Sequence, residues 1–417
     1  MGYGFNDFFA PRAIFFGTLL NGVTSKDGVK KFARYEATTM RLRLSELAWR
    51  NLVHDKVRLL VTVTGVVFAV VLIVVQFGLF LGFATTTSSL VDRSRADLWI
   101  TSANVPYIEV GVNFSERKLS TVLATPGVAH ATKYIARFSQ WQRRDGRQES
   151  VQIVGFDPDQ TLGGPWNLVE GSVSDLKLDD NVFIDELYKV KLGVTRIGDV
   201  FEIRGRRARV AGFTRGIRSF TTSPYVFTSF KSAQTYVNLP EDQTVFILVR
   251  GDGSVGLDEL RHRLLSRLKG VDVVTTTEFS RMTTFYWMFT TGAGVAVLLA
   301  ALLGLVVGVV VVAQTIYATT MDHLQEYGTL KAMGATNGYL YRVIIQQAVI
   351  SAVIGYSLAM VASWFVVRGS AKGGAAILLP WPVALGMFWL TLAMCTTAAL
   401  VSINKVTRLD PAMVFKG

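Results

Sequence analysis

The stretch Leu59–Ala84 reads LLVTVTGVVFAVVLIVVQFGLFLGFA and contains no charged side chain. An α-helix needs roughly 20 apolar residues to cross the hydrocarbon core of a bilayer. The stretch therefore predicts a transmembrane helix over 59–84. The composition of the whole chain agrees, because only 18% of its 417 residues are charged, whereas soluble globular chains carry about 25%.

Three further apolar stretches lie in the second half of the chain. Residues 282–321 form a run of 40 positions without charge. That is about twice the length of a span, so the second helix is placed over about 290–317. The aromatic run 285–289 before it suits either an aromatic belt or a helix rising out of the bilayer. Two more helices are predicted over about 343–367 and 378–403. Together these stretches predict an integral membrane α-helical protein with four transmembrane helices.

Four spans place both termini on the same side of the membrane. Residues 1–58 carry ten basic and five acidic side chains, and an excess of basic residues marks the cytoplasmic side. We therefore expect a cytoplasmic N-terminal segment over 1–58, cytoplasmic termini, and a location in the inner (plasma) membrane. The first 39 residues contain an apolar run too short for a span, and they are interpreted as a terminus of low information rather than as a signal peptide.

Residues 85–282 then face outward, and their pattern predicts a large mixed α/β domain between the first and second helices. Asp145-Gly146 is a strong hairpin signal, and Gly205 marks a second hairpin. The expected strands are 97–101, 133–141, 150–155, 200–203, 208–213, 245–249 and 271–275. Leucines at helical spacing predict a helix over 258–269, and a short helix is expected over 115–123 with Ser115 as its N-cap.

Several function classes lose support from what the sequence lacks. It has no GxxxxGK[ST] motif for a nucleotide triphosphate, no HExxH, no paired CxxC and no GxSxG. Cys395 is its one cysteine, which excludes an intrachain disulfide and a cysteine-based metal site. Residues 85–282 hold 26 basic and 23 acidic side chains, so nothing favours a nucleic-acid face. We expect neither enzymatic activity nor a cofactor bound by this chain.

The stretch Tyr317–Thr336, YATTMDHLQEYGTLKAMGAT, follows the second span. Its pattern predicts that a helix leaves the membrane, continues as a short amphipathic segment over about 318–334, and ends near Gly334, a residue suited to a helix C-terminus. Such an elbow can transmit force from a partner into the spans. An ordinary helical connection with no partner fits the spacing equally well.

Two other patterns point to contacts. Gly78 and Gly82 in the first span, and Gly304 and Gly308 in the second, have the small-xxx-small spacing that lets helices approach closely, although chance also produces it in glycine-rich spans. A cluster of arginines in the outer block suggests an anion-binding or partner-docking patch, or more simply a solvated strand face. Its members are Arg204, Arg206, Arg207, Arg209, Arg215 and Arg218.

The elbow resembles the E-I/F-G-x-L-K-A-x-G-A-T signature of the MacB/FtsX/LolC family of ABC-transporter permeases. Residues 408–415 resemble the closing segment of that family. More narrowly, four segments resemble the DevC type, the permease of the DevBCA glycolipid exporters. They are GGPWNL (163–168), RSFTTSPYVF (218–227), YWMFTTGAG (286–294) and VAQTIY (312–317).

This resemblance implies a division of labour. A separate ATPase subunit would bind ATP and Mg, and the permease would transmit its motion as part of a homodimer. The outer block would be a MacB-type periplasmic core that meets a membrane-fusion protein, with a TolC-type outer-membrane channel completing the conduit in double-membrane bacteria. Residues 283–417 would be the FtsX-like permease domain. The residues implied in coupling to the ATPase are His323, Glu326, Tyr327, Lys331, Met333 and Gly334.

The predicted function is therefore the permease subunit of an exporter of glycolipid or another amphiphile. Two alternatives share the architecture. One is an FtsX-like signalling permease that controls a cell-wall hydrolase, and the other is a LolC-type release of lipoproteins. The DevC-like segments and the size of the outer block favour export.

Overall fold

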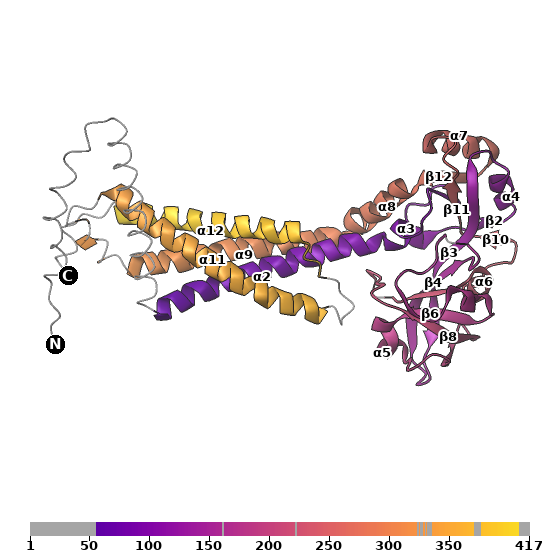
Figure 1. Cartoon of the computed structure of the whole chain (residues 1–417), viewed down its shortest axis with the longest axis horizontal. Helices are drawn as coiled ribbons and strands as arrows, with labels where there is room; N and C mark the ends of the chain where they lie inside the picture. The colour runs from indigo at the N-terminus through magenta and orange to yellow at the C-terminus, as the bar shows by residue number, and fades with distance from the viewer. Residues whose placement is uncertain are drawn as a thin grey trace, which may run out of the picture. The chain divides into compact units, whose positions relative to one another are not determined.

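The computed structural model describes residues 56–160, 162–221, 223–322, 325, 328, 329, 331, 336–370 and 377–407. Within these ranges four helices are long and apolar enough to cross a membrane (Figure 1). They are α2 (Lys56–Thr87), α9 (Ala293–Asp322), α11 (Asn337–Ser370) and α12 (Trp381–Thr407). The four predicted spans and the predicted fold class are confirmed.

Helices α2 and α11 extend past both ends of the stretches that predicted them, whereas α9 and α12 begin three residues later than predicted and extend past the predicted ends. Charge-free runs locate the part of a helix in lipid, whereas a helix ends only where its backbone hydrogen bonds end. At the end of α2, for example, the hydroxyls of Thr85, Thr86 and Thr87 donate to the carbonyl oxygens of Leu81, Gly82 and Phe83 at 2.8, 2.7 and 2.6 Å. Each of these threonine hydroxyls therefore has its hydrogen-bond acceptor within α2.

The chain divides into two compact units, and each long helix contributes to both. The first unit comprises Met1–Val70, Val307–Met360 and Leu385–Gly417. Helices pack closely there because glycine leaves room: a Cβ at Gly355 would lie 2.5 Å from Val66 Cγ1. Tyr356 and Phe388 add an edge-to-face ring contact, with centroids 5.2 Å apart.

The second unit, Val71–Val306 with Val361–Ala384, contains the α/β domain. Its main sheet has ten strands in the order β12-β1-β11-β3-β4-β9-β6-β8-β5, with β7 pairing with β3 and β8. The strands are β1 (Leu98–Ser102), β3 (Val128–Gln142), β4 (Gln148–Phe156), β5 (Leu168–Glu170), β6 (Asn181–Asp185), β7 (Val200–Ile203), β8 (Arg206–Thr214), β9 (Tyr225–Ser229), β11 (Phe246–Gly251) and β12 (Val271–Thr275). The sheet is mixed, because the β4·β9 and β6·β8 pairs are parallel.

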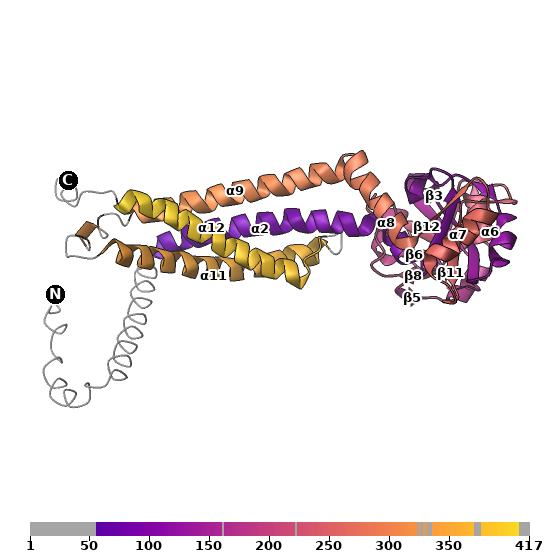
Figure 2. The same ribbon diagram turned by 90° about the horizontal axis from the view of Figure 1, so that it is seen from above.

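Short helices accompany this sheet. The α-helices are α3 (Ser89–Asp92), α4 (Lys118–Leu123), α5 (Lys189–Leu192), α6 (Phe230–Tyr236), α7 (Leu257–Arg267) and α8 (Thr276–Phe285), and the other turns are η1 (Ile108–Val110), η2 (Val173–Lys177), η3 (Glu186–Tyr188) and the π-helical η4 (Tyr286–Thr290). Helix α7 lies against β12 and buries Leu260 and Leu264 with side chains of β1 and β11 (Figure 2). It thus crosses over between β11 and β12, which flank β1 on either side.

Both predicted hairpins are present. β3 and β4 pair in antiparallel register, and Gly146 takes the left-handed φ of 81° that their turn requires. In the β7–β8 turn, Arg204 and Gly205 both have positive φ, 49° and 72°, as a two-residue type I′ turn demands.

The helix predicted over 115–123 was wrong at its start. Ser115 belongs to the two-stranded sheet of β2 (Phe114–Ser115) and β10 (Gln243–Thr244), where it pairs with Gln243. The helix begins only at Lys118. The strand partner comes from more than 120 positions further along the chain, so a local pattern could not have predicted it.

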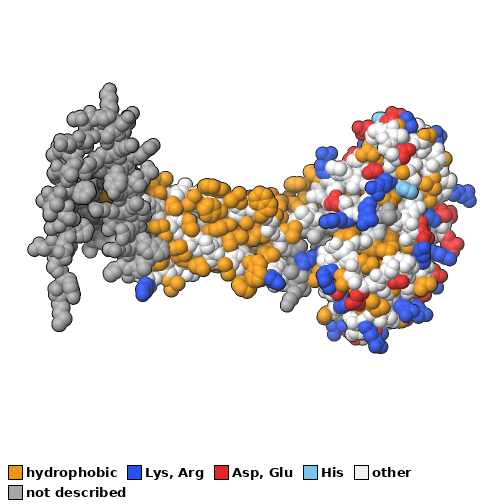
Figure 3. All heavy atoms as spheres, in the orientation of Figure 1, with side chains coloured by type: hydrophobic (Ala, Val, Ile, Leu, Met, Phe, Trp, Pro, Cys, Tyr) orange, Lys and Arg blue, Asp and Glu red, His pale blue; other side chains and the backbone are white. Residues whose placement is uncertain are grey.

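The core of the domain is aromatic. Trp99 of β1 is fully buried, and its ring lies 5.4 Å from Tyr134, 5.5 Å from Phe246 and 5.3 Å from Phe279. These side chains come from β3, β11 and α8, so one indole packs against both the sheet and the helix that leaves it. Charged side chains of both signs cover the domain, whereas the visible faces of the long helices are mainly hydrophobic (Figure 3).

Candidate functional site

Five of the six residues predicted to couple to an ATPase lie outside the described residues: His323, Glu326, Tyr327, Met333 and Gly334. Lys331 is described and has helical backbone. The segments 1–55 and 408–417 also lie outside the described part of the chain. The coupling role of these residues therefore stays a prediction.

Two long helices run into the sheet with almost no intervening linker. Helix α2 ends at Thr87, α3 begins at Ser89, and β1 follows at Leu98. On the return path, β12 passes directly into α8 at Thr276, and η4 leads to α9. Thr276 ties the two paths together, since its Oγ1 donates to the Ala96 carbonyl oxygen at 2.6 Å. The chain thus enters and leaves the domain through neighbouring, hydrogen-bonded segments.

Five rings, here called the aromatic joint, connect these paths to the domain: Phe83, Tyr107, Phe220, Tyr286 and Trp287. Tyr107 stacks on Tyr286 with centroids 3.8 Å apart and 18° between the planes. Phe220 lies 4.5 Å from Trp287 and 5.7 Å from Phe83. The joint therefore joins the end of α2, the residue before η1, the loop before β9, and η4.

The aromatic run 285–289 places some of its side chains in the aromatic joint and leaves others exposed. The run is helical, which fits the prediction of a helix rising out of the bilayer. Its residues face two ways, because Tyr286 and Trp287 pack on the domain while Phe285 and Phe289 are 59% and 54% exposed. Only the second pair suits an aromatic belt.

Glu109 of η1 is a buried carboxyl beneath the joint. Its Oε2 accepts a hydrogen bond from Trp287 Nε1 at 3.2 Å, and its Oε1 has no hydrogen-bond partner among the described residues. Burial raises the pKa of Glu109 from 4.5 to about 7, because the low-dielectric surroundings disfavour the carboxylate. Near neutral pH a proton therefore adds to or leaves this carboxyl.

This raised pKa predicts a pH-dependent stability. The folded protein keeps the proton of Glu109 at pH values between 4.5 and about 7, where the unfolded chain has lost it. The contribution of Glu109 to the free energy of unfolding is therefore fully present below pH 4.5. It is lost as the pH rises through about 7, by about 3 kcal/mol in total. In Glu109→Gln this dependence should vanish, while the amide oxygen still accepts from Trp287. Denaturation of both proteins at several pH values tests this, and parallel pH profiles would contradict it.

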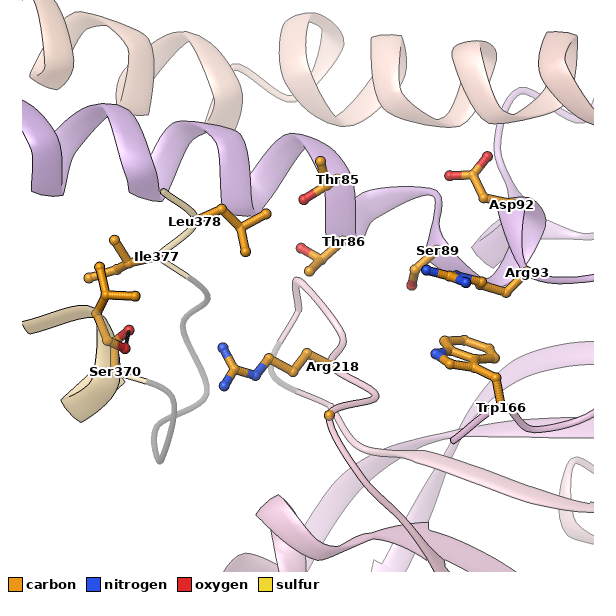
Figure 4. Close-up of a pocket in the computed structure, with 12 residues that line it drawn as sticks. Thr85, Thr86, Ser89, Asp92, Arg93, Trp166, Arg218, Ser370, Ile377 and Leu378 are labelled. Carbon is orange, nitrogen blue, oxygen red and sulfur yellow. Dashed lines mark hydrogen bonds between the residues drawn. The ribbon is translucent and has the colours of Figure 1, made fainter. Parts of the chain in front are cut away.

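A cavity of about 540 Å³ lies in the same unit as the joint. It is lined by segments from the end of α2, α3, two domain loops, the end of α11 and the residues before α12 (Figure 4). Its lining residues are Thr85, Thr86, Ser89, Asp92, Arg93, Trp166, Gly216, Arg218, Val367, Ser370, Ile377 and Leu378.

Gly78 closes one wall of this region by bringing Ile377 and Leu378 onto α2. The Leu378 N–H donates to the Gly78 carbonyl oxygen at 3.1 Å. A Cβ at Gly78 would lie 2.7 Å from Ile377 Cγ2 and 3.0 Å from Leu378 O, so a larger residue would push the segment away. Gly78 of the small-xxx-small pattern in the first span thus lies against the chain segment before α12.

The substitution Gly78→Ala tests this close approach. Overpacking costs about 1–3 kcal/mol, and the gain in helix propensity of about 1 kcal/mol only partly offsets it. Gly386→Ala is the matched control, because nothing lies within 4 Å of a Cβ at that helical glycine. We expect G78A to unfold at a lower temperature than G386A in the same detergent. Equal midpoints would show that the Gly78 contact is dispensable.

The other predicted packing glycines, Gly82, Gly304 and Gly308, are buried. A Cβ at Gly304 would lie 3.4 Å from Gln76 Cγ and 3.6 Å from Leu72 Cγ, so α9 approaches α2 of the same chain here. A homodimer formed through these glycines stays a prediction.

The arginine cluster separates into different surroundings. Arg204, Arg206, Arg207 and Arg209 are exposed on the β7–β8 hairpin. Arg215 pairs with Glu186, with Nε 2.8 Å from Oε2, and Arg218 lines the cavity. Sequence proximity alone could not distinguish these positions.

Comparisons with known proteins match two regions of the chain. Residues 59–266 match the MacB-like periplasmic core domain, and residues 298–411 match the FtsX-like permease C-terminal domain. An uncharacterized ABC transporter permease of Mycobacterium tuberculosis is 24% identical over 389 residues, which cover 90% of this chain and 98% of that protein. An uncharacterized ABC transporter permease of Mycobacterium bovis is 25% identical over 392 residues, with the same coverage of 90% and 98%.

Two solved structures are similar to part of the chain. The periplasmic region of MacB from Actinobacillus actinomycetemcomitans matches with a TM-score of 0.36 and 12% identity, covering 45% of this chain and 92% of that one. The extracellular domain of the ABC-type transporter YknZ from Gram-positive bacteria matches with a TM-score of 0.32 and 8% identity, covering 43% and 98%.

Proposed function

The chain is an ABC transporter permease of the MacB/FtsX family, and from this premise we propose that it transmits ATP-driven motion to its α/β domain. Such a permease works with an ATPase partner. The sequence has no P-loop of its own, which supports a separate subunit as the site of ATP binding and hydrolysis.

One observation carries the proposal: the paths between the long helices and the sheet are short and mutually bonded. Thr276 binds the backbone before β1, and the aromatic joint packs both paths on the domain. A displacement of α2 or α9 at this end therefore has to move β1 and β12 as well, because packed interfaces deform little before they rearrange. A flexible linker would dissipate the same displacement.

The wider assembly belongs to the same proposal. We place the chain in the inner membrane with both termini in the cytoplasm, on the basis of the basic N-terminal segment. Two permeases would pair, and the α/β domain would meet a membrane-fusion protein and a TolC-type channel in a tripartite efflux assembly. The DevC-like segments support a glycolipid or another amphiphile as the cargo.

The test is reconstitution with a candidate ABC ATPase subunit. We expect the two to co-purify from detergent, and the permease in liposomes to raise the ATPase rate above that of the ATPase alone. An ATPase subunit without its catalytic carboxylate is the control for contaminating activity. ATP hydrolysis by the purified chain alone would contradict the proposal, as would failure of the ATPase to bind. Activation of a cell-wall hydrolase or release of lipoproteins, without export, would favour the alternatives.

A further inference from the structure

We infer that a polar groove beside α6 binds an acidic, extended segment of a partner protein. It is lined by α6, the loop after it, the residue after β2, β3 and the β7–β8 hairpin. This inference rests on the proposed function, which places the α/β domain outside the membrane in contact with a protein partner. The lining residues are Glu116, Lys133, Arg204, Arg206, Phe230, Lys231, Gln234, Thr235, Asn238, Leu239 and Glu241.

The groove has the size of a ligand site but offers little surface to a hydrocarbon. Its volume is about 740 Å³, within the ordinary range of ligand pockets, about 300–1,000 Å³. The two large apolar side chains in the lining are nearly buried, since Phe230 is 8% exposed and Leu239 is 7% exposed. An acyl chain would therefore find little apolar surface to cover. The lining suits a polar ligand rather than a lipid.

Basic side chains outnumber acidic ones in the lining, four to two. One of each forms an internal pair, because Lys133 Nζ lies 2.7 Å from Glu116 Oε2. The remaining acidic residue is Glu241, and the remaining cations are Arg204, Arg206 and Lys231. These three cations are exposed, and they form no ion pair with any of the described residues. The groove therefore favours an anionic ligand.

The cations come from two elements that are bonded to each other. Arg204 and Arg206 belong to the β7–β8 hairpin, and Lys231 belongs to α6. At the end of α6, the Tyr236 hydroxyl donates to the Arg207 carbonyl oxygen at 2.7 Å, which bonds the helix to β8. The backbones that carry the charges are thus in place before a ligand binds, and this lowers the cost of ordering them.

The loop after α6 forms the other wall and is closed around one side-chain amide. Gln234 Nε2 donates to three carbonyl oxygens of this loop, those of Pro240, Glu241 and Gln243, at 3.2, 3.2 and 2.9 Å. The Glu116 N–H donates to the Asp242 carbonyl oxygen at 2.9 Å, so the loop is also bonded to the residue after β2. Two exposed residues on this wall supply acceptor oxygens, namely Asn238 and Glu241.

An acidic peptide satisfies both walls. Its carboxylates can pair with Arg206 and Lys231, and its backbone N–H groups can donate to the Asn238 amide oxygen and the Glu241 carboxylate. These N–H groups are available in an extended segment, whereas a helix uses them internally. The segment is therefore expected to bind in an extended conformation.

Other anions fit the lining less well. Nucleic acid would meet two carboxylates, and it would find no ring for base stacking, because Phe230 is nearly buried and Lys133 Nζ lies 4.5 Å from its centroid. A free phosphate would leave the acceptors Asn238 and Glu241 without a donor. A protein segment that carries carboxylates matches the cations and the acceptors together.

The test uses the full-length chain in detergent, without the ATPase. A fluorescent peptide of alternating glutamate and serine is titrated by anisotropy, and a peptide of alternating glutamine and serine is the reference. We expect the glutamate peptide to bind about tenfold more tightly, as two or three exposed ion pairs would together give. High salt should remove this preference, because counterions screen exposed charges.

Variants assign the binding to the groove. R206Q/K231Q should lose most of the preference, and R206K/K231R should keep it. R207Q/R209Q is the matched control, because it removes the same charge but its side chains leave β8 on the other face from Arg206; it should bind as the wild type does. E241Q should bind the glutamate peptide about threefold more tightly, a gain that partial unfolding cannot produce. Thermal midpoints of the variants confirm folding.

The remaining outcomes would contradict the inference. Equal binding of the two peptides, or an equal loss in R207Q/R209Q, would overturn it. Displacement of the peptide by inorganic phosphate at the same concentration would identify a small-anion site, and tighter binding of a DNA duplex would identify a nucleic-acid surface. Self-association abolished in R206Q/K231Q would make a second copy of the chain the occupant.

The inference and the proposed function can fail separately. If the glutamate peptide binds as expected but the ATPase is not stimulated in reconstitution, the proposed function fails and the groove remains a binding site. If the ATPase is stimulated but the chain does not distinguish the two peptides, the inference fails and the proposed function stands.

Discussion

Replacing Lys331 with glutamate should reduce the stimulated ATPase rate to that of the ATPase subunit alone. Lys331 belongs to the elbow after α9, which resembles the family segment that meets the ATPase. A charge placed opposite a charge of its own sign in a docked interface costs several kcal/mol, and each 1.4 kcal/mol lowers the affinity about tenfold. Glu326→Lys should act in the same direction, because it reverses the other charge of the elbow.

The assay is ATP hydrolysis by the reconstituted complex, together with co-purification of the two subunits. Lys331→Arg keeps the charge and should retain stimulation. Lys191→Glu makes the same charge change on α5 of the α/β domain and should leave the ATPase rate unchanged. If K331E stimulated the ATPase subunit as fully as the wild type does, the elbow would have no role in coupling and would be an ordinary helical connection.

The second large effect is expected at the centre of the α/β domain. Trp99→Ala should lower the free energy of unfolding of this domain by about 3–5 kcal/mol, a large part of the 5–15 kcal/mol typical of a folded domain. The indole is fully buried against Tyr134, Phe246 and Phe279. Its removal leaves a cavity at the point where β1 and α8 meet.

Denaturation in detergent, followed by limited proteolysis, measures this change. Leu178→Ala is the control, because Leu178 is 64% exposed in the same domain and should shift stability by less than about 0.5 kcal/mol. If W99A were as resistant to protease as L178A, the aromatic core would not hold the domain together. In that case the contacts of the aromatic joint, rather than the packing of Trp99 on Phe279, would hold α8 against the domain.

The spans were predictable from sequence because burial in lipid imposes a simple rule on every residue. A charge-free run of about 20 residues has few alternatives, and 59–84 satisfied it. The two hairpin turns could also be predicted from the sequence, because Asp145-Gly146 and Gly205 each supply a backbone conformation that few residues adopt. Helix α7 followed from the spacing of its leucines.

The joint and the cavity were not predictable in this way. Glu109 and Trp287 are separated by 178 positions, and Phe83 meets Phe220 through the path of the sheet rather than through any local pattern. One signal was available, since Glu109 is an isolated carboxyl in the apolar stretch 105–112, VPYIEVGV. A buried carboxyl is costly unless paired or protonated, so such a residue points to a special environment.

The order of the sheet has one further consequence. Leu98 of β1 and Thr275 of β12 are register partners, so the first and last long strands of the domain start and finish side by side. The chain therefore enters and leaves the domain through two paired strand ends, whose Cα atoms lie roughly 5 Å apart. A short peptide linker that joins these two strand ends would allow the α/β domain to be produced separately from the membrane helices. A different domain whose first and last strands pair in the same way could be inserted between the same two helices.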